Sequence, residues 1–312
     1  MERNLIEFRP LNITEIIAAA LRSLYRNPSA TLLISLNFSL ILGLVSLLGL
    51  YFAPLNEDLL NELIALSETG SLDPIALENL LTQIWPLIIF LIISTFLLYL
   101  FQGVITGILA PVIGFLVTGS KLTRNETWMR SKKQLGKLFV LSFAILIIEI
   151  ISFVAPIFLI SAISVLFPQT IASLLVTAGL IMSLVLLILV WTSLLLAPVI
   201  LILENTSIKL SFLRSNNLVK KNFFRIFFGT LWALIIGQAL AFFGQLPFSL
   251  ISSSVQDLNQ LTTFSVFSET LGAVVGYMLL LSFFASYLCL LYTDQRIRHE
   301  NLANNLKSAM GR

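Results

Sequence analysis

One acidic residue lies inside a long apolar stretch of the chain, where a charge is costly. Glu149 stands near the middle of the run from Phe139 to Phe167. An ionisable group at such a depth in lipid points to a functional site unless a partner neutralises it. Gln102 and Gln238, in two other apolar stretches, are the expected hydrogen-bond partners. The three side chains would form either a proton, cation or lipid-headgroup site or a neutral hydrogen bond between helices.

Basic residues in polar segments beside the apolar stretches offer a second kind of chemistry. A Lys or Arg near an anionic membrane surface contributes about 1 kcal/mol of attraction. These residues are therefore candidate contacts for anionic lipids, although they would equally serve to orient the chain in the membrane. The candidates are Arg22, Arg26, Lys132, Lys133, Lys220, Lys221 and Arg225.

Catalytic and metal-binding patterns are missing from the sequence. It has one cysteine, Cys289, and one histidine, His299. These exclude an intramolecular disulfide and argue against a zinc site, which takes three or four nitrogen or sulfur ligands. There is no Gly-rich phosphate loop, no His-Glu-x-x-His and no Gly-x-Ser-x-Gly motif. We therefore expect no catalytic residue, metal or cofactor, and no enzyme activity.

The elements that must position these residues are membrane-spanning helices. The chain is 57% hydrophobic and 11% charged, whereas soluble domains carry about 25% charged residues. A spanning helix needs about 20 mostly apolar residues, and six stretches meet that requirement. The sequence predicts an all-α polytopic helical bundle with spans at Ser29–Ala53, Pro86–Thr118, Phe139–Phe167, Ile171–Leu203, Ile226–Ile251 and Leu271–Tyr292. Prolines 111, 156, 198 and 247 are expected to kink or end their helices.

The distribution of charge predicts the orientation. All 19 Lys and Arg residues lie before span one, between spans two and three, between spans four and five, or after span six. The segments on the other side contain no Lys or Arg, and all of their charged residues are acidic. The positive-inside rule then places both termini in the cytoplasm. The expected location is a cytoplasmic membrane, and nucleic acid is not an expected partner.

The chain is expected to form one integral membrane domain, 1–312, built from three similar parts. Leu109-Ala110-Pro111-Val112-Ile113 recurs at residues 196–200, and the pair Lys132-Lys133 recurs at 220–221. An apolar stripe at helical spacing within residues 13–24 resembles the segments that follow each copy. Asn12 with Glu15 and Thr123 with Glu126 resemble capping boxes. We interpret the chain as three parallel pseudo-repeats, each an interfacial amphipathic helix followed by a transmembrane hairpin.

The boundaries of these segments follow from the spans and the polar connections. The first segment covers 1–118 and includes an outer loop, 54–85, in which two short amphipathic helices are expected. The second covers 119–203, the third covers 204–292, and a cytoplasmic tail covers 293–312. The Gly103-x-x-x-Gly107 and Gly272-x-x-x-Gly276 spacings favour close helix packing, within the bundle or in a homodimer.

Short motifs near both ends and in the middle resemble a known family. They are Arg9-Pro10-Leu11, Glu15-Ile16 and Arg26-Asn27-Pro28 near the start, the stretch from Pro198 through Glu204 to Arg214-Ser215 and Phe223-Phe224-Arg225, and Tyr292-x-Asp294-x-Arg296-x-Arg298-x-Glu300 near the end. With them the chain resembles bacterial integral membrane proteins related to the glycerophosphoryl diester phosphodiesterase membrane domain. The resemblance implies mainly a fold, because the soluble catalytic barrel of such esterases has no counterpart here. Ala18, Lys221 and Asn301 depart from the pattern.

Two functions remain open at this point. The first is a non-enzymatic scaffold or accessory protein that organises lipids or protein partners through its basic face. Membrane lipids are its expected partners, with other membrane proteins or a second copy of the chain as further candidates. The alternative is a transporter or lipid-handling protein with a midplane site near Glu149.

Overall fold

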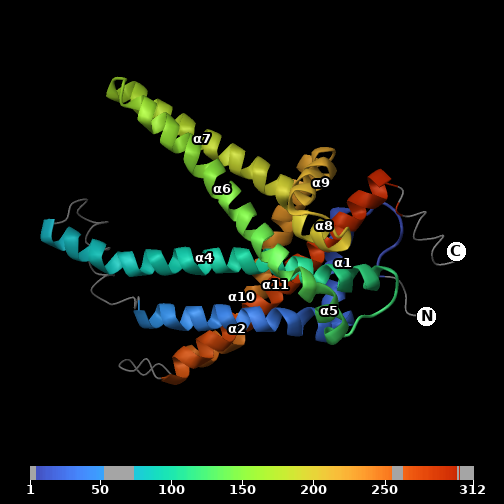
Figure 1. Cartoon of the computed structure of the whole chain (residues 1–312). Coiled ribbons are helices and arrows are strands. Elements are labelled where there is room, and N and C mark those ends of the chain that lie inside the picture. Colours follow the sequence, from blue (N-terminus) through green and yellow to red (C-terminus); the bar gives the residue numbers. More distant parts are fainter. Residues whose placement is uncertain (1–4, 53–73, 255–262, 301, 303–312) are drawn as a thin grey trace. The chain divides into compact units, whose positions relative to one another are not determined.

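The computed structural model describes residues 5–52, 74–254, 263–300 and 302, and it is all-α in these ranges (Figure 1). Long apolar helices are interspersed with shorter helices, as expected for a chain whose spans must satisfy their own backbone hydrogen bonds in lipid. The helices are α1 (Ile13–Arg26), α2 (Pro28–Phe52), α4 (Pro74–Val117), α5 (Arg124–Ser131), the 3-10 turn η1 (Lys132–Gln134), α6 (Leu135–Ser164), α7 (Gln169–Leu194), α8 (Ala197–Leu203), α9 (Ile208–Lys220), α10 (Phe223–Ser254) and α11 (Thr263–Glu300).

Within the described residues, six helical stretches are long and apolar enough to cross a membrane, which confirms the predicted polytopic helical bundle. Each contains one of the six predicted spans or most of it. They are Pro28–Gly49, Ile84–Val117, Arg124–Ser164, Gln169–Leu203, Phe223–Ser252 and Phe264–Glu300.

The prolines act differently from one span to another. Pro111, Pro156 and Pro247 lie inside the continuous helices α4, α6 and α10. In the fourth span, α7 ends at Leu194, and α8 begins a new helix with Pro198 in its first turn. Proline is well tolerated there, because the first turn of a helix has no intrahelical partner for its amide groups. The fourth span is therefore divided within its apolar stretch, at the second copy of Leu-Ala-Pro-Val-Ile.

The outer loop is described only in its second half. Residues 74–84, expected to form a separate amphipathic helix, are instead the first part of α4. The other expected amphipathic helix falls at residues 59–66, outside the described residues. Residues 74–84 therefore continue directly into span two as one helix and do not form a separate amphipathic helix.

The described chain divides into two compact units, each assembled from separate parts of the sequence. Unit 1 contains residues 1–34, 100–238 and 281–312, and unit 2 contains residues 35–99 and 239–280. Both units cross the boundaries of the three predicted segments. In unit 2, α10 and α11 pack closely, because a methyl group at Gly272 or Gly276 would collide with Phe248 or Gln245.

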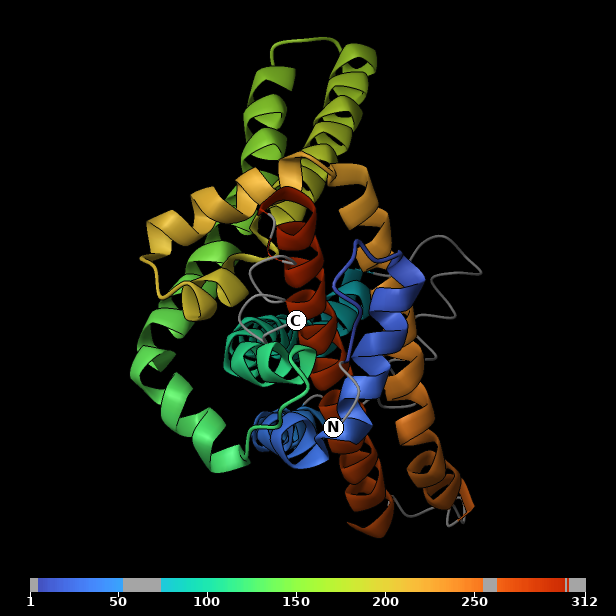
Figure 2. The same ribbon diagram turned by 90° about the vertical axis from the view of Figure 1, so that its right-hand side faces the viewer.

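Unit 1 holds the fully buried core of the protein. Its members include both copies of Leu-Ala-Pro-Val-Ile, whose side chains are all buried. Gly107 lets α4 approach α6, since a methyl group there would collide with Leu138. This glycine, like Gly276 in unit 2, packs against a helix of its own chain, as the first interpretation of the two Gly-x-x-x-Gly spacings predicted. Helices α6 and α7 run side by side as a hairpin (Figures 1 and 2).

Candidate functional site

The last turns of α11 organise one end of unit 1, where the short helices α1, α5, α8 and α9 also lie (Figure 2). We call it the basic end. The motif Tyr-x-Asp-x-Arg-x-Arg-x-Glu at residues 292–300 is helical here. Side chains that are four residues apart share one face of a helix. The motif therefore divides into two faces, one with Asp294 and Arg298 and another with Tyr292, Arg296 and Glu300.

The first face clamps the chain segment that leads into α1. Asp294 is fully buried, and its carboxylate accepts hydrogen bonds from the backbone N–H of Leu11 at 2.8 Å and from Arg225 at 2.9 Å. Arg298 donates to the same carboxylate at 3.0 Å. Both guanidinium groups also donate to the Leu11 carbonyl oxygen, at 2.6 and 2.7 Å. A buried carboxylate is tolerated only with such compensation, so Asp294 joins α1, α10 and α11 at one point.

The second face forms an ion-pair network with α9 and the end of α8. Glu204, which follows α8, accepts a hydrogen bond from Tyr292 at 2.7 Å and pairs with Arg214 of α9 at 3.2 Å. Arg214 also pairs with Glu300 at 2.5 Å, and Glu300 pairs with Arg296 at 2.9 Å. Two carboxylates and two guanidinium groups thus neutralise one another, with the side chains a fifth to a third exposed.

Helix caps fix the register of the short helices. Thr123 caps α5 and forms the predicted capping box with Glu126, and the predicted box of Asn12 with Glu15 begins α1. Ser207 caps α9, and its hydroxyl oxygen accepts a hydrogen bond from the backbone N–H of Leu210. An N-cap oxygen satisfies an amide that the helix leaves unpaired. The basic side chains that follow are therefore held at defined positions along each helix.

A shared arginine-serine pair then stands at the same position after the cap in α5 and α9. The pairs are Arg130-Ser131 and Arg214-Ser215, preceded by a Met or a Leu. Both serines are fully buried, and each donates to a backbone carbonyl of the preceding span, Ser131 to Ile108 at 3.4 Å and Ser215 to Ser193 at 2.6 Å. The serines attach each short helix beside one copy of Leu-Ala-Pro-Val-Ile.

The two arginines of these pairs have different surroundings. Arg214 has its two carboxylate partners, whereas the guanidinium group of Arg130 stacks over the ring of Phe115, 4.8 Å from the centroid. Arg130 forms no ion pair with any residue that the structure describes. The acid one turn earlier, Glu126, has an oxygen held by the N–H and hydroxyl of Thr123, at 2.8 and 2.9 Å.

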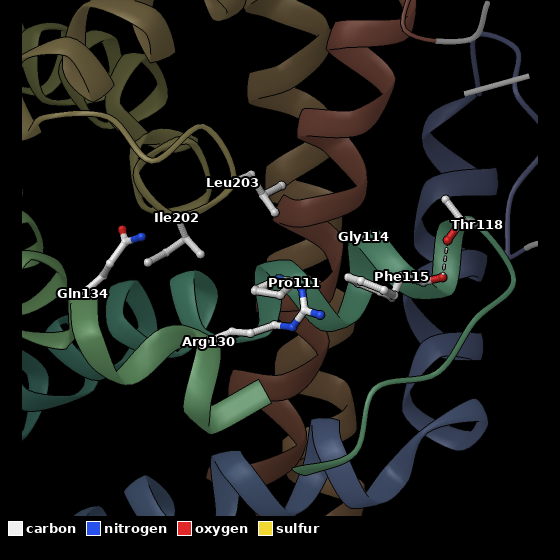
Figure 3. A pocket seen from close by; sticks show the side chains of 8 residues that line it. All are labelled: Pro111, Gly114, Phe115, Thr118, Arg130, Gln134, Ile202 and Leu203. Carbon is white, nitrogen blue, oxygen red and sulfur yellow. Dashed lines mark hydrogen bonds between the residues drawn. The ribbon is translucent and has the colours of Figure 1, made fainter. Parts of the chain in front are cut away.

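Arg130 borders a cavity of about 390 Å³ at the basic end (Figure 3). One wall comes from the last turns of α4, a second from α5 and η1, and a third from the end of α8. The cavity lies where the two copies of Leu-Ala-Pro-Val-Ile end, and it combines a cation with apolar walls. Its lining residues are Pro111, Gly114, Phe115, Thr118, Arg130, Gln134, Ile202 and Leu203.

The predicted intramembrane site is placed as follows. Glu149 is buried on α6, with 8% of its surface exposed. Gln102 is half-buried on α4 and donates to Thr106 of its own helix at 3.2 Å. Gln238 is exposed on α10. The structure thus shows a buried acid, and the three-residue site stays a prediction.

The predicted lipid contacts fall into three groups. Lys132, Lys133, Lys220 and Lys221 are all exposed. Arg22 and Arg26 of α1 are half-buried, and Arg22 donates to the carbonyl of Ala18. Arg225 differs from both groups, because its guanidinium group is held by Asp294 and Leu11. It belongs to the structural clamp of the basic end.

The sequence offered a signal for part of this arrangement. The i, i+4 spacing within residues 292–300 indicates two polar helix faces. The sequence alone does not indicate which residues these faces contact. Nothing local indicates that Leu11 and Asp294 meet, since 283 positions separate them. Among the described residues, no group of three or more His, Cys, Asp or Glu side chains is placed to hold a metal ion.

The fold and the basic end together define a multi-pass, all-α membrane protein with two clusters of ion pairs at one end of unit 1. Residues 11–295 match the model of a family described as a domain of unknown function, DUF7847, and the chain belongs to that family. No curated protein and no solved structure matches the chain. The family description names no activity, and the resemblance to the glycerophosphoryl diester phosphodiesterase membrane domain stays an expectation.

Proposed function

We propose that this chain is a non-enzymatic scaffold or accessory protein of a bacterial cytoplasmic membrane, which organises anionic lipids or protein partners at its basic end. One observation carries the proposal: four arginines of the basic end are paired inside the fold, whereas four of its lysines are exposed. Arg214, Arg225, Arg296 and Arg298 are paired with carboxylates inside the fold. The four exposed lysines form no ion pair with a described residue.

The lysines have the placement that an anionic surface requires. Lys132 and Lys133 follow α5 in η1, and Lys220 and Lys221 end α9. The positive-inside rule puts this end in the cytoplasm, where bacterial and other membranes expose anionic headgroups. Four such lysines would contribute about 4 kcal/mol at low salt, at about 1 kcal/mol each. Screening reduces this attraction beyond about 10 Å at 0.1 M salt.

The test compares how strongly the protein selects lipids in reconstituted vesicles. The full chain is placed in phosphatidylcholine vesicles with traces of spin-labelled phosphatidylglycerol or phosphatidylcholine, and the immobilised fraction of each label is measured. We expect the wild type to favour phosphatidylglycerol, and salt to weaken the preference. Replacing Lys132, Lys133, Lys220 and Lys221 by Gln should abolish it, whereas replacing them by Arg should preserve it. A preference that survives the Gln substitutions would contradict the proposal.

Transport or lipid handling through Glu149 is the alternative, supported by the burial of this acid on α6. The substitution Glu149→Gln keeps the shape and removes the ionisable proton. A scaffold should retain its lipid selectivity and its fold after this change. A transporter should stay folded and lose proton- or cation-coupled uptake in vesicles. A folded Glu149→Gln protein without lipid selectivity would favour the alternative.

A further inference from the structure

Two arginines of the basic end have equivalent positions and unequal partners. Arg130 and Arg214 follow the N-cap residues of α5 and α9 at the same spacing, and each precedes a buried serine that attaches its helix to a span. Around Arg214, the carboxylates of Glu204 and Glu300 supply two negative charges. Around Arg130 the chain supplies none within ion-pair distance among the described residues, and the cavity of about 390 Å³ lies there instead.

The lining of this cavity suits an amphiphile. In Figure 3 the Arg130 side chain extends beside Pro111 toward Phe115, while Ile202 and Leu203 lie on the α8 side. The ring of Phe115 contacts one face of the guanidinium group, and no carboxylate in the described part of the chain accepts from the N–H donors of Arg130. A guanidinium group binds phosphate oxygens in a bidentate manner. Apolar walls next to it exclude water from the remaining part of a ligand.

We propose that this cavity binds one membrane phospholipid, with the anionic phosphate on Arg130 and the adjoining glycerol and acyl carbons against Pro111, Ile202 and Leu203. The phosphate takes the place that carboxylates occupy around Arg214. This inference deepens the proposed function and rests on it, because it names one lipid held at a defined site within a lipid-organising face. It uses none of the four exposed lysines.

Gly114 provides a way to close the cavity without disturbing its walls. A Cβ atom at this position would have only the Leu203 side chain nearby, at 4.0 Å, which is an ordinary contact. A leucine there would extend into the cavity. Gly136 on α6 has nothing within 4 Å of such a Cβ atom and does not line the cavity. The same substitution at Gly136 is therefore a matched control for Gly114→Leu.

The experiment is native mass spectrometry of the full chain released from nanodiscs that contain phosphatidylglycerol and phosphatidylcholine. We expect one retained phospholipid per wild-type chain. Its occupancy should fall at least about tenfold in Arg130→Gln, because the variant loses the charge-assisted hydrogen bonds from the guanidinium group to the phosphate. Gly114→Leu should lose it as well. Gly136→Leu and Arg124→Gln, which changes an exposed arginine of the same helix, should keep it.

Three outcomes would overturn the inference. They are a wild-type chain without a retained lipid, a retained lipid that is unaffected in both Arg130→Gln and Gly114→Leu, and retention of added inorganic phosphate or glycerol phosphate in place of the lipid. Circular dichroism of each variant establishes that it is folded. The fourfold Lys→Gln protein should keep this single lipid, so failure of the lysine surface and failure of the cavity are separate results.

Discussion

The two copies of Leu-Ala-Pro-Val-Ile are identical in sequence and differ in structure. The first, at residues 109–113, lies in the uninterrupted helix α4, and the second, at 196–200, follows a break between α7 and α8. Ser215 bridges the break, accepting from the N–H of Leu196 at 3.2 Å and donating to the carbonyl of Ser193 at 2.6 Å. Beside the first copy, Ser131 makes one longer bond to a carbonyl. The same five residues thus differ in backbone conformation, and the nearby serine pairs the backbone groups that the break in the second copy leaves free of helical hydrogen bonds.

The surroundings of the two copies differ in charge as well. The second copy ends at Glu204, which enters the ion-pair network of Arg214, Tyr292 and Glu300. The first copy ends at Gly114 and Phe115, and an open cavity with Arg130 lies beside it. A repeated scaffold therefore yields one closed region, stabilised by its own carboxylates, and one open region. If the proposed lipid site exists, stability and binding are divided between the two copies.

The largest effect should come from the closed side of the basic end. Asp294→Ala removes a fully buried carboxylate and leaves Arg225, Arg298 and the N–H of Leu11 without their acceptor. We expect a loss of about 3 kcal/mol in the free energy of unfolding, because one half of a buried ion pair remains uncompensated. SDS titration in mixed micelles measures it. Arg130→Ala on the open side should cost no more than about 0.5 kcal/mol, and equal losses would break the comparison.

A smaller difference should separate the two buried serines. Ser215→Ala leaves a buried N–H and a buried carbonyl at the helix break unpaired and should cost about 1–2 kcal/mol. Ser131→Ala removes one hydrogen bond of 3.4 Å from a continuous helix and should cost about 0.5 kcal/mol. Each variant is the control of the other, and the same SDS titration applies. If Ser131→Ala were the more harmful change, the proposed role of Ser215 at the break would be wrong.

The smallest effect concerns the start of α1 and depends on pH. Hydrogen bonds from Arg9 lower the pKa of Glu15 below its ordinary value of 4.5. A carboxyl with a lowered pKa stabilises the fold fully above its unfolded-state pKa, and this stabilisation disappears as the pH falls through the folded-state value. Glu15→Gln should therefore lower the Tm slightly at pH 7, and the difference should shrink as the pH falls below 4.5. Glu7→Gln, which removes the other carboxylate partner of Arg9 at 2.7 Å, is the comparison, and a Glu15→Gln difference that grows on acidification would contradict this assignment.

The spans and the helix starts could be predicted because their signals are local. Apolar runs of spanning length and the pairs Asn12 with Glu15 and Thr123 with Glu126 depend on residues that are neighbours in the chain. The break before Pro198 could not be predicted, since the same five residues occur in α4 without one. The backbone groups at the break are paired by a hydroxyl group on α9. A pentapeptide carries no information about a donor that folding brings to it.

The candidate site was predicted unevenly for the same reason. The exposed lysines could be identified, because a lysine next to a transmembrane span usually extends into water. The sequence alone groups Arg225 with these lysines, because its partner Asp294 lies 69 positions further along the chain and gives no local signal. The cavity beside Arg130 had no local signal, since its walls come from α4, α5 and α8. Glu149 stays a prediction, with its burial as the one feature that the structure adds.

The clamp on Leu11 also has a consequence for biosynthesis. Leu11 and Asp294 are 283 positions apart, so the ribosome makes the acceptor after both Leu11 and Arg225. Until α11 has been made, Arg225 lacks its Asp294 partner, and the segment before α1 is held to α4 by the hydrogen bond from the N–H of Leu5 to the carbonyl of Leu116. A chain that stops short of residue 294 therefore lacks the carboxylate of the clamp. Synthesis of α11 is the step that completes the attachment of Leu11 to the bundle.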